Sequence, residues 1–400
     1  MTLKSALLGA TAALVALPAA AERGADGNLN IIYWQAPSLL NPFLSGGTKE
    51  VEAASLVLEP LARYDNNGNM VPYLVDEIPT VENGGVSEEL RSITWTLSEG
   101  LLWSDGTPVT SADAKFTWEY CTHPEGGCAQ LSYFTDVTDI EIVDDRTFTI
   151  KFGVAKPFPY GPLVGNESPL IQKAQFENCL GAAAPTCTDA NFAPIGTGPF
   201  VVTDFKANDV ATYAANENYR DPAKPRFATI NFKGGGDAAA AARSVLETGE
   251  FDYAWNLQVE PEILAQMEAA GRGEIIVAFG TSVERQMVNF TNPDPALGDE
   301  RGTVAHPHPF LTDPAVRKAL SMAIDREILV EIGYGATGKV TCNVLPAPAA
   351  FASTSNDDCK TQNIAGANAL LDAAGWEMGS DGVRAKAGER LSLLYPPSTT

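Results

Sequence analysis

The chain contains the segment Leu102-Trp103-Ser104-Asp105-Gly106-Thr107-Pro108-Val109-Thr110-Ser111-Ala112-Asp113, in which a tight turn leads into the start of a helix. Glycine and proline just after Asp105 mark the turn. Thr110, followed three residues later by Asp113, is a variant of the capping box, which satisfies free N–H groups in the first turn of a helix. We therefore expect a helix that begins here and extends through Tyr120.

Strand patterns lie on both sides of this segment. Residues 92–97 alternate strictly between polar and apolar side chains, which is the pattern of a half-buried strand. Residues 140–143 and 147–152 are joined through Asp144-Asp145-Arg146 and predict a β-hairpin.

Closer to the N-terminus, a strand precedes a helix. Residues 29–34 form a compact apolar strand, and residues 48–61 carry a helical stripe that includes Val51, Ala54 and Leu58. A strand that feeds a helix predicts an α/β unit.

Beyond residue 196 the chain again alternates between turns, strands and helices. Gly196-Thr197-Gly198-Pro199 predicts a turn before a strand over residues 200–204, and the proline-rich residues 292–309 predict a long surface loop. Helix-start and helix-stop residues predict further helices over residues 237–248, from Pro261, from Asp313-Pro314, and over about 364–374 before Gly375.

The first 21 residues have the pattern of a secretory signal peptide. Lys4 supplies positive charge, Ala6 to Ala16 form an apolar run too short to span a bilayer, and Ala19-Ala20-Ala21 is a small-residue cleavage site. We expect export to the periplasm. Because no cysteine precedes Cys121, we expect free release and not a lipid anchor.

All six cysteines lie beyond this leader, as three couples that are close in sequence. An even number in an oxidising compartment indicates disulfides, whereas the spacing within each couple does not fit zinc ligands. The sequence leaves other connectivities open, and proximity favours Cys121 with Cys128, Cys179 with Cys187, and Cys342 with Cys359.

The chain is strongly acidic. It has 50 acidic and 27 basic residues and a net charge of -23. Nucleic acid is excluded as a partner, because its binding depends on Lys and Arg that neutralise phosphates. The acidity favours cationic ligands at long range.

Motifs for catalysis are weak. The three histidines, His123, His306 and His308, lie in turn-like sequence, and we expect the last two to be solvated in a loop. Gly234-Gly235-Gly236 lacks the lysine and hydroxyl of a P-loop, and Asp237 after it indicates a helix cap. We expect no enzyme activity and no cofactor or metal; a secreted hydrolase is the weaker alternative.

Residues 102–113 resemble the most characteristic segment of the family-5 extracellular solute-binding proteins, which include dipeptide, oligopeptide and nickel receptors. Further segments resemble that family in the same order along residues 29–395. They are Leu58-Glu59-Pro60-Leu61 with residues 64–68 and Pro72, residues 196–200 with Asn218-Tyr219, Ser244-Val245-Leu246 with residues 249–252, and residues 313–321 with 323–326.

The resemblance implies a two-lobed α/β periplasmic binding protein fold of type II with an extra domain. Residues 22–64 and 190–278 would form the first lobe, residues 65–189 the extra domain, and residues 279–400 the second lobe. Residues 391–395 resemble an early strand of that lobe, so we expect the second lobe to be incomplete in this chain. The implied protein is a monomer that captures solute between its lobes and delivers it to ABC permease subunits in the inner membrane.

The resemblance also implies a ligand site. A receptor for varied peptides should grip backbone groups in β-strand-addition style, leaving side chains in roomy pockets. The expected solute is a di- or oligopeptide; a nickel chelate or an oligosaccharide is the alternative. The turn before the first helix has a second interpretation, in which Thr48 only caps the helix. The candidate ligand-binding residues are Ser45, Gly46, Gly47, Thr48, Tyr253, Trp255 and Asn256, with Tyr133 of the extra domain as a weaker candidate.

Overall fold

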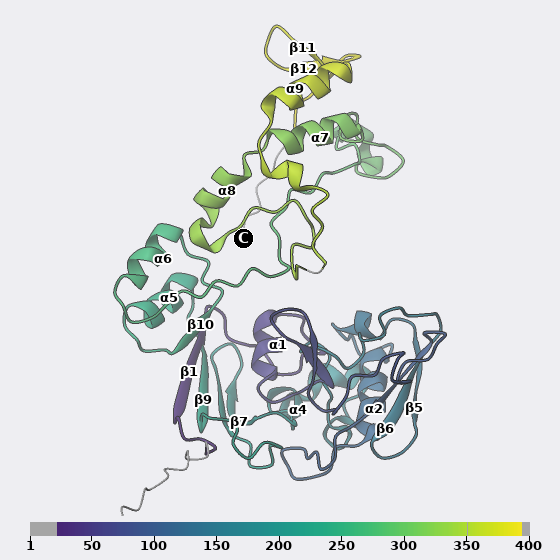
Figure 1. Ribbon diagram of the computed structural model, residues 1–400, viewed down its shortest axis with the longest axis vertical. Coiled ribbons are helices and arrows are strands. Elements are labelled where there is room, and N and C mark those ends of the chain that lie inside the picture. Colours follow the sequence, from purple (N-terminus) through teal and green to yellow (C-terminus); the bar gives the residue numbers. More distant parts are fainter. Residues whose placement is uncertain (1–21, 350, 394–400) are drawn as a thin grey trace, which may run out of the picture. The chain divides into compact units, whose positions relative to one another are not determined.

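Figure 1 shows the computed structural model, which describes residues 22–349 and 351–393. The chain forms two compact units that divide after Gln258. The expected signal peptide lies outside the described residues, and the expected boundaries of the lobes and the extra domain stay predictions.

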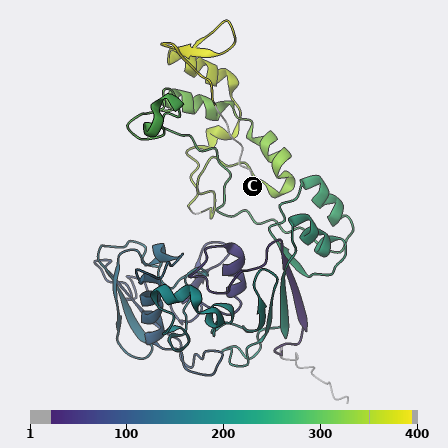
Figure 2. The ribbon, with the colours of Figure 1, turned by 180° about the vertical axis from the view of Figure 1, so that it is seen from behind.

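The first unit contains a five-stranded sheet with the strand order β10-β1-β9-β8-β7. β1 (Asn28–Tyr33) runs parallel to both of its neighbours, β9 (Thr229–Gly234) and β10 (Tyr253–Trp255). β8 (Val210–Ala215) and β7 (Phe200–Lys206) extend the sheet with antiparallel pairing. Segments far apart in the sequence therefore lie side by side in one sheet (Figures 1 and 2).

β1 is apolar because both faces of the sheet are covered around it. Ile31 and Tyr33 belong to a core that includes α1 (Thr48–Ala54), whereas Ile32 belongs to a core that includes α5 (Ala238–Leu246). A strand that is buried on both faces carries consecutive apolar residues, which is the pattern of Ile31, Ile32 and Tyr33 after Asn30.

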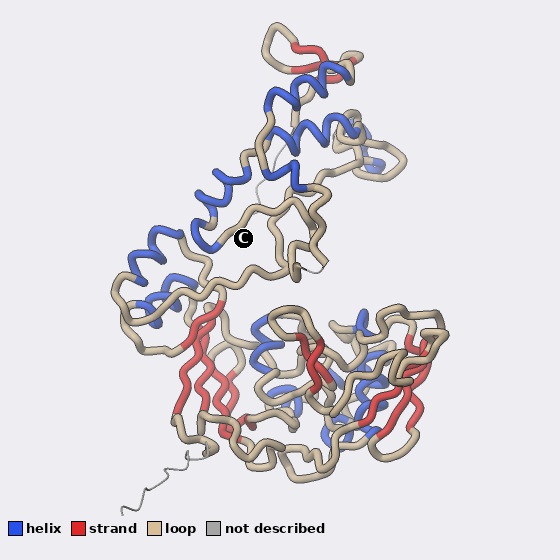
Figure 3. The backbone as a smooth tube through the Cα atoms, in the orientation of Figure 1, coloured by secondary structure: helices blue, strands red, loops and turns tan. Residues whose placement is uncertain are grey.

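A smaller sheet lies in the same unit, with the strand order β4-β6-β5. β4 (Ser92–Thr96), β6 (Thr147–Phe152) and β5 (Val137–Ile142) pair antiparallel, as the sequence predicts. Asp144 Oδ1 accepts hydrogen bonds of 2.8 Å from the N–H groups of Arg146 and Thr147, which fixes the hairpin turn. Figure 3 shows these strands apart from the larger sheet.

The segment from Leu102 folds into the predicted turn and helix. Gly106 adopts a φ of 85°, and Asp105 Oδ1 accepts a 2.9 Å hydrogen bond from the N–H of Thr107. α2 (Ser111–Thr122) then begins with the Asp113 carboxylate accepting a 2.9 Å bond from the N–H of Thr110. The capping-box prediction is therefore confirmed.

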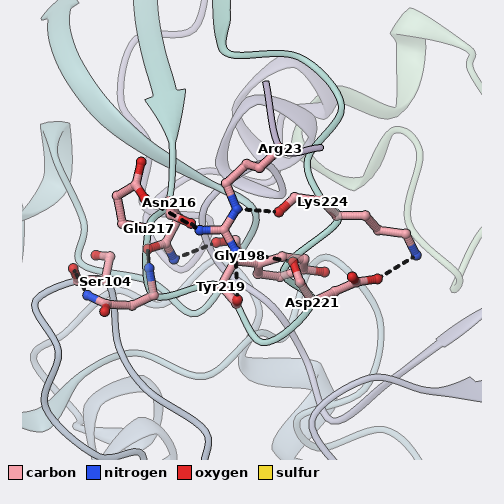
Figure 4. Close-up of polar contacts among 9 residues, drawn as sticks. Arg23, Ser104, Gly198, Asn216, Glu217, Tyr219, Asp221 and Lys224 are labelled. Atoms are coloured by element: carbon pink, nitrogen blue, oxygen red, sulfur yellow. Dashed lines mark hydrogen bonds and ion pairs between the residues drawn. The ribbon is translucent and has the colours of Figure 1, made fainter. Parts of the chain in front are cut away.

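Side-chain to backbone hydrogen bonds connect this turn to the rest of the first unit (Figure 4). The Arg23 guanidinium donates to the carbonyls of Asn216 at 2.7 Å and Lys224 at 2.8 Å. The Asn216 amide donates to the carbonyl of Gly198 at 2.8 Å, and its neighbour Asn218 donates to the carbonyl of Ser104 at 3.0 Å. The side chains of Arg23, Asn216 and Asn218 thus join four separate turns.

The remaining elements of the first unit are short. β2 and β3 form an antiparallel pair. Their bounds and those of the short helices are β2 (Ala62–Tyr64), β3 (Met70–Pro72), η1 (Leu131–Phe134), α3 (Lys173–Phe176), η2 (Gly181–Thr186) and α4 (Thr188–Phe192).

The regular elements of the second unit are mainly helices joined by long loops, and its small core buries Phe310, Leu311, Val316 and Trp376. No helix among the described residues has the length and apolar character needed to cross a membrane. The elements of the second unit are α6 (Pro261–Glu268), η3 (Pro295–Glu300), α7 (Pro314–Ala323), α8 (Arg326–Gly333), η4 (Gly335–Thr337), η5 (Asp357–Lys360), α9 (Ile364–Ala373), β11 (Glu377–Met378), β12 (Arg384–Lys386) and β13 (Glu389–Arg390).

The three expected disulfides are present in the structure. They join Cys121 to Cys128, Cys179 to Cys187, and Cys342 to Cys359. Each bond closes a loop within one unit.

Three expectations from the sequence are wrong in detail. The helix expected over residues 48–61 ends at Ala54, because the next turns use their carbonyls elsewhere: Val57 C=O accepts from Gly198 N–H at 2.7 Å. His308 is 7 % exposed and not solvated, because its ring packs edge-on against Phe310. Residues 391–393 lie outside any strand, and the rest of that predicted strand lies outside the described residues.

Candidate functional site

The candidate site lies where three parallel strands end. In the sheet register Tyr33 is opposite Gly234 of β9 on one side and Trp255 of β10 on the other. The carboxyl ends of these strands therefore share one edge, which is where α/β sheets bind their ligands.

Tyr33 organises this edge. Its ring is 4 % exposed and stacks on Trp255, with the ring centroids 5.2 Å apart and an interplanar angle of 22°. On its other side it contacts Phe232 at a centroid distance of 4.6 Å. The Tyr33 hydroxyl donates a hydrogen bond to the Glu52 carboxylate of α1. One buried tyrosine thus holds an aromatic ring and a carboxylate next to each other.

Glu52 is a half-buried carboxylate in apolar surroundings. Burial raises its pKa, the nearby Glu167 carboxylate raises it further, and the hydrogen bond from Tyr33 opposes the shift. None of the ion pairs formed within residues 22–349 and 351–393 includes Glu52. Among the described residues, the Glu52 carboxylate therefore has a hydrogen bond from Tyr33 but no ion pair with lysine or arginine.

Tyr253 and Asn256, two of the candidates from the sequence, flank Trp255 on this edge. Tyr253 is 49 % exposed, and burial together with Glu52 raises its pKa. Asn256 has a φ of 53°, a left-handed conformation that asparagine tolerates better than most residues. The chain leaves β10 at this residue, so an amide side chain stands at the rim of the sheet.

The turn before α1 lies close to this cluster along the chain. Gly47 is the N-cap of α1, and Thr48 is its first helical residue, so Thr48 does not cap the helix. The Ser45 hydroxyl accepts a 3.2 Å hydrogen bond from the Gly47 N–H, while Gly46 is exposed. A side chain at Gly47 would collide with the Glu50 carboxylate, which explains the glycine.

Glu50, next to this turn, has a structural role. It is 1 % exposed and accepts bonds from the Ser38 N–H at 2.9 Å and the Ser38 hydroxyl at 2.8 Å. Burial opposes ionisation, but the hydrogen bonds from Lys49 and Ser38 outweigh it and lower the pKa of Glu50. The two acidic residues on α1 therefore have different contacts: Glu50 bonds to Ser38 in the loop after β1, and Glu52 bonds to Tyr33.

Tyr133 lies on the 3-10 helix η1. It is half-buried and lines a cavity of about 350 Å³ together with Phe152, Phe158 and other residues. Burial raises the pKa of Tyr133, and the Glu167 carboxylate adds to the shift. Glu167 therefore interacts with both Tyr133 and Glu52.

The structure brings Tyr253 and Trp255 together with two residues that the sequence analysis missed, Tyr33 and Glu52. The missed signal was local: an aromatic residue at the end of the first apolar strand, and a glutamate one turn into the following helix. Nothing in the spacing joined them to residues more than 200 positions later.

A comparison with protein families identifies the class of protein. The model of the bacterial extracellular solute-binding proteins, family 5 (middle), matches residues 69–400. The chain belongs to this family, whose members are two-lobed solute receptors of ABC importers and not enzymes.

Curated relatives are similar over most of the chain. Protein XP55 of Streptomyces lividans is 28 % identical over 366 residues, covering 90 % of this chain and 60 % of that protein. The periplasmic murein peptide-binding protein MppA of Escherichia coli is 25 % identical, covering 85 % and 61 %. The nickel-binding periplasmic protein of Escherichia coli is 25 % identical, covering 88 % and 62 %. The chain thus spans about three fifths of the length of these relatives.

Solved structures have the same fold. NikA from Brucella suis in complex with Fe(III)-EDTA aligns with a TM-score of 0.67 and 24 % identity, covering 92 % of this chain and 68 % of that one. The oligopeptide-binding protein AppA from Bacillus subtilis, in complex with a nonapeptide, aligns with a TM-score of 0.61 and 20 % identity over the same shares.

Proposed function

We propose that this protein is a periplasmic receptor that captures di- or oligopeptides and delivers them to the permease of an ABC importer. The observation that carries the proposal is the edge at the carboxyl ends of β1 and β10, where Tyr33 bonds to the Glu52 carboxylate and stacks on Trp255, and where Glu52 raises the pKa of Tyr253. Aromatic rings with polar edges suit peptides, which combine apolar side chains with polar backbone groups.

Backbone contacts would come from the neighbouring turn. Gly46 is exposed and has no side chain, so a peptide backbone can approach it closely. The Asn256 amide can donate to one peptide group and accept from another. Ser45 and Thr48 add hydroxyls to the same turn. Together these groups suit the shared backbone of peptides more than one particular side chain.

The names of relatives support a peptide as the solute, and they also support a second class of solute. MppA is named as a murein peptide-binding protein and AppA was solved with a nonapeptide, whereas NikA was solved with a metal chelate. A nickel chelate or an oligosaccharide is therefore the alternative solute. We also propose export through residues 1–21, a periplasmic location and a monomeric state.

Native mass spectrometry of the full-length protein purified from cells tests this proposal. We expect a bound peptide that dissociates on denaturation and is recovered unchanged. A chelated metal or a sugar in its place would overturn the peptide assignment and support the alternative. Recovery of a processed product would instead favour a hydrolase.

Binding also has a thermodynamic signature. A peptide held about 100-fold above its Kd should stabilise the native protein by about 2.7 kcal/mol, because it binds only the folded form. Differential scanning fluorimetry with peptide, chelate and sugar libraries measures this shift for each class. A melting temperature raised only by chelates or sugars would contradict the proposal.

A further inference from the structure

We propose that the Glu52 carboxylate, positioned by the buried Tyr33 and lying near the rings of Tyr253 and Trp255, binds a positively charged group of the solute, either a primary ammonium or a guanidinium. The inference rests on the proposed function, because it assigns the charge of the solute that this edge of the sheet receives. The proposed function itself does not require a charged solute.

The geometry first shows that the carboxylate is held in place. Glu52 accepts its hydrogen bond from a tyrosine that is 4 % exposed and stacked on Trp255 at 5.2 Å. β1 and β10 are in register, so Tyr253, paired with Ile31, lies on the same face as Trp255, paired with Tyr33. The three rings thus lie on one face of two adjacent strands, and the Glu52 carboxylate of α1 bonds to one of them.

This combination of groups favours cations. The faces of tyrosine and tryptophan rings attract ammonium and guanidinium groups, and a carboxylate adds a charge-assisted hydrogen bond. Glu52 takes part in none of the ion pairs among the described residues, since Lys49 on the same helix pairs with Glu50. A solute cation would therefore meet a carboxylate that no lysine or arginine among the described residues already pairs with.

A second carboxylate adds to the effect. Glu167 lies close enough to influence both Glu52 and Tyr133. Tyr133 in turn lines a cavity of about 350 Å³ whose walls include Phe152, Phe158 and Lys156, and Lys156 pairs with Asp136 at 2.6 Å. This cavity contains its own cation, so the inference rests on the groups around Glu52 and not on the cavity. An anionic solute would be repelled by both carboxylates.

The test uses charge-matched probes on the full-length protein. One pair is the peptide Ala-Lys-Ala and the same peptide with an acetylated lysine, both with blocked termini; the other is cadaverine and its diacetyl derivative. Calorimetry on the wild type should show the cationic member of a pair binding about tenfold more tightly, the usual size of one charged hydrogen bond. Glu52→Gln should reduce this ratio to near one. The control Glu89→Gln, at an exposed site elsewhere in the first unit, should leave it unchanged.

Each outcome decides the inference. Equal binding of both members of each pair, or a preference that survives in Glu52→Gln, overturns it while the proposed function stands if either peptide binds. Failure of every probe to bind also overturns it, and native mass spectrometry then decides separately whether the solute is a peptide. Because Glu52→Gln could disturb packing, Tyr33→Phe serves as a second variant. It keeps the ring but removes the hydrogen bond to Glu52, and it should weaken the preference by a smaller factor.

Discussion

The two units of the chain are held together in different ways. In the first unit, β1 pairs with strands about 200 residues later in the sequence. Buried polar groups of this unit also connect distant segments, as in the hydrogen bond from Arg220 to Glu59. In the second unit, a small cluster of buried side chains lies around Phe310 and Trp376, and Leu264 and Met267 of α6 are buried as well. Ile276, Met287 and Val304 of that unit are 79 %, 83 % and 94 % exposed.

The candidate site lies in the unit with the long-range pairing. Its aromatic and carboxylate groups lie on β1, β10 and α1, which strand pairing and packing hold in place. The second unit has a smaller core, to which single polar contacts add, such as the hydrogen bond of 3.1 Å from the Trp376 indole to Asp313. The four expectations below test this contrast.

Loss of a buried ion pair in the first unit should have the largest effect. Glu59 has a side chain that is 1 % exposed, and it accepts bonds of 2.5 and 3.1 Å from Arg220. Arg220→Met would leave this carboxylate buried without its cation, which costs about 3–5 kcal/mol. Urea denaturation measures the loss. The exposed pair of Arg243 and Glu247 provides the control, since Arg243→Met should cost about 0.5 kcal/mol or less. Equal losses of unfolding free energy in the two variants would show that the buried contact between distant segments contributes no more than the exposed pair.

Removal of the disulfide in the second unit should come next. Cys342 and Cys359 are 17 residues apart, whereas Cys121 and Cys128 in the first unit are 7 apart. By loop entropy alone, the double serine variants should lose about 3 and about 2.4 kcal/mol respectively. Thermal unfolding compares them, and peptide mapping without reduction checks the pairing. Free thiols at these positions in the purified protein would show that the disulfides do not form and would contradict this prediction.

A pH dependence should be specific to the second unit. His308 Nδ1 accepts hydrogen bonds from the N–H groups of Phe310 at 3.3 Å and Leu311 at 3.1 Å, and a protonated ring could accept neither. Burial lowers the pKa of His308, against an opposing effect of Glu389.

Because the folded pKa is lower than the unfolded value, the unfolded chain binds the proton more readily. Stability should therefore be complete above about pH 6.5 and decline as the pH falls towards the folded pKa. We expect a loss on the order of 1 kcal/mol, similar to one buried hydrogen bond. Hydrogen exchange at several pH values measures each unit separately, and His308→Asn is the matched variant. A decline of the same size in His308→Asn would assign the pH dependence to other groups.

The smallest effect on stability should occur at the rim of the sheet. Asn256 has a φ of 53°, which glycine adopts without strain, so Asn256→Gly should change stability by no more than about 0.5 kcal/mol. If its amide contacts the solute, the same variant should weaken peptide binding. Calorimetry and denaturation on one sample separate the two quantities. A large loss of stability with unchanged binding would show that Asn256 is structural.

Much of the local structure could be predicted from the sequence. The capping box at Thr110, the hairpin at Asp144 and the caps at Asp237 and Asp313 were all predicted correctly, because each depends on a side chain bonding to backbone within a few residues. The family resemblance was also confirmed. Errors arose where distant segments compete for the same backbone groups, as at the end of α1 near Val57.

The sequence by itself determined the class of fold, the acidic charge and most of the order of helices, strands and turns along the chain. Periodicity, caps and composition are local properties of the residues. Tertiary structure alone decided that Tyr33, Glu52 and Trp255 lie together and that His308 is buried. The physical reason is that sheet register and side-chain packing join residues from separate segments, and no local pattern records which strand lies beside which.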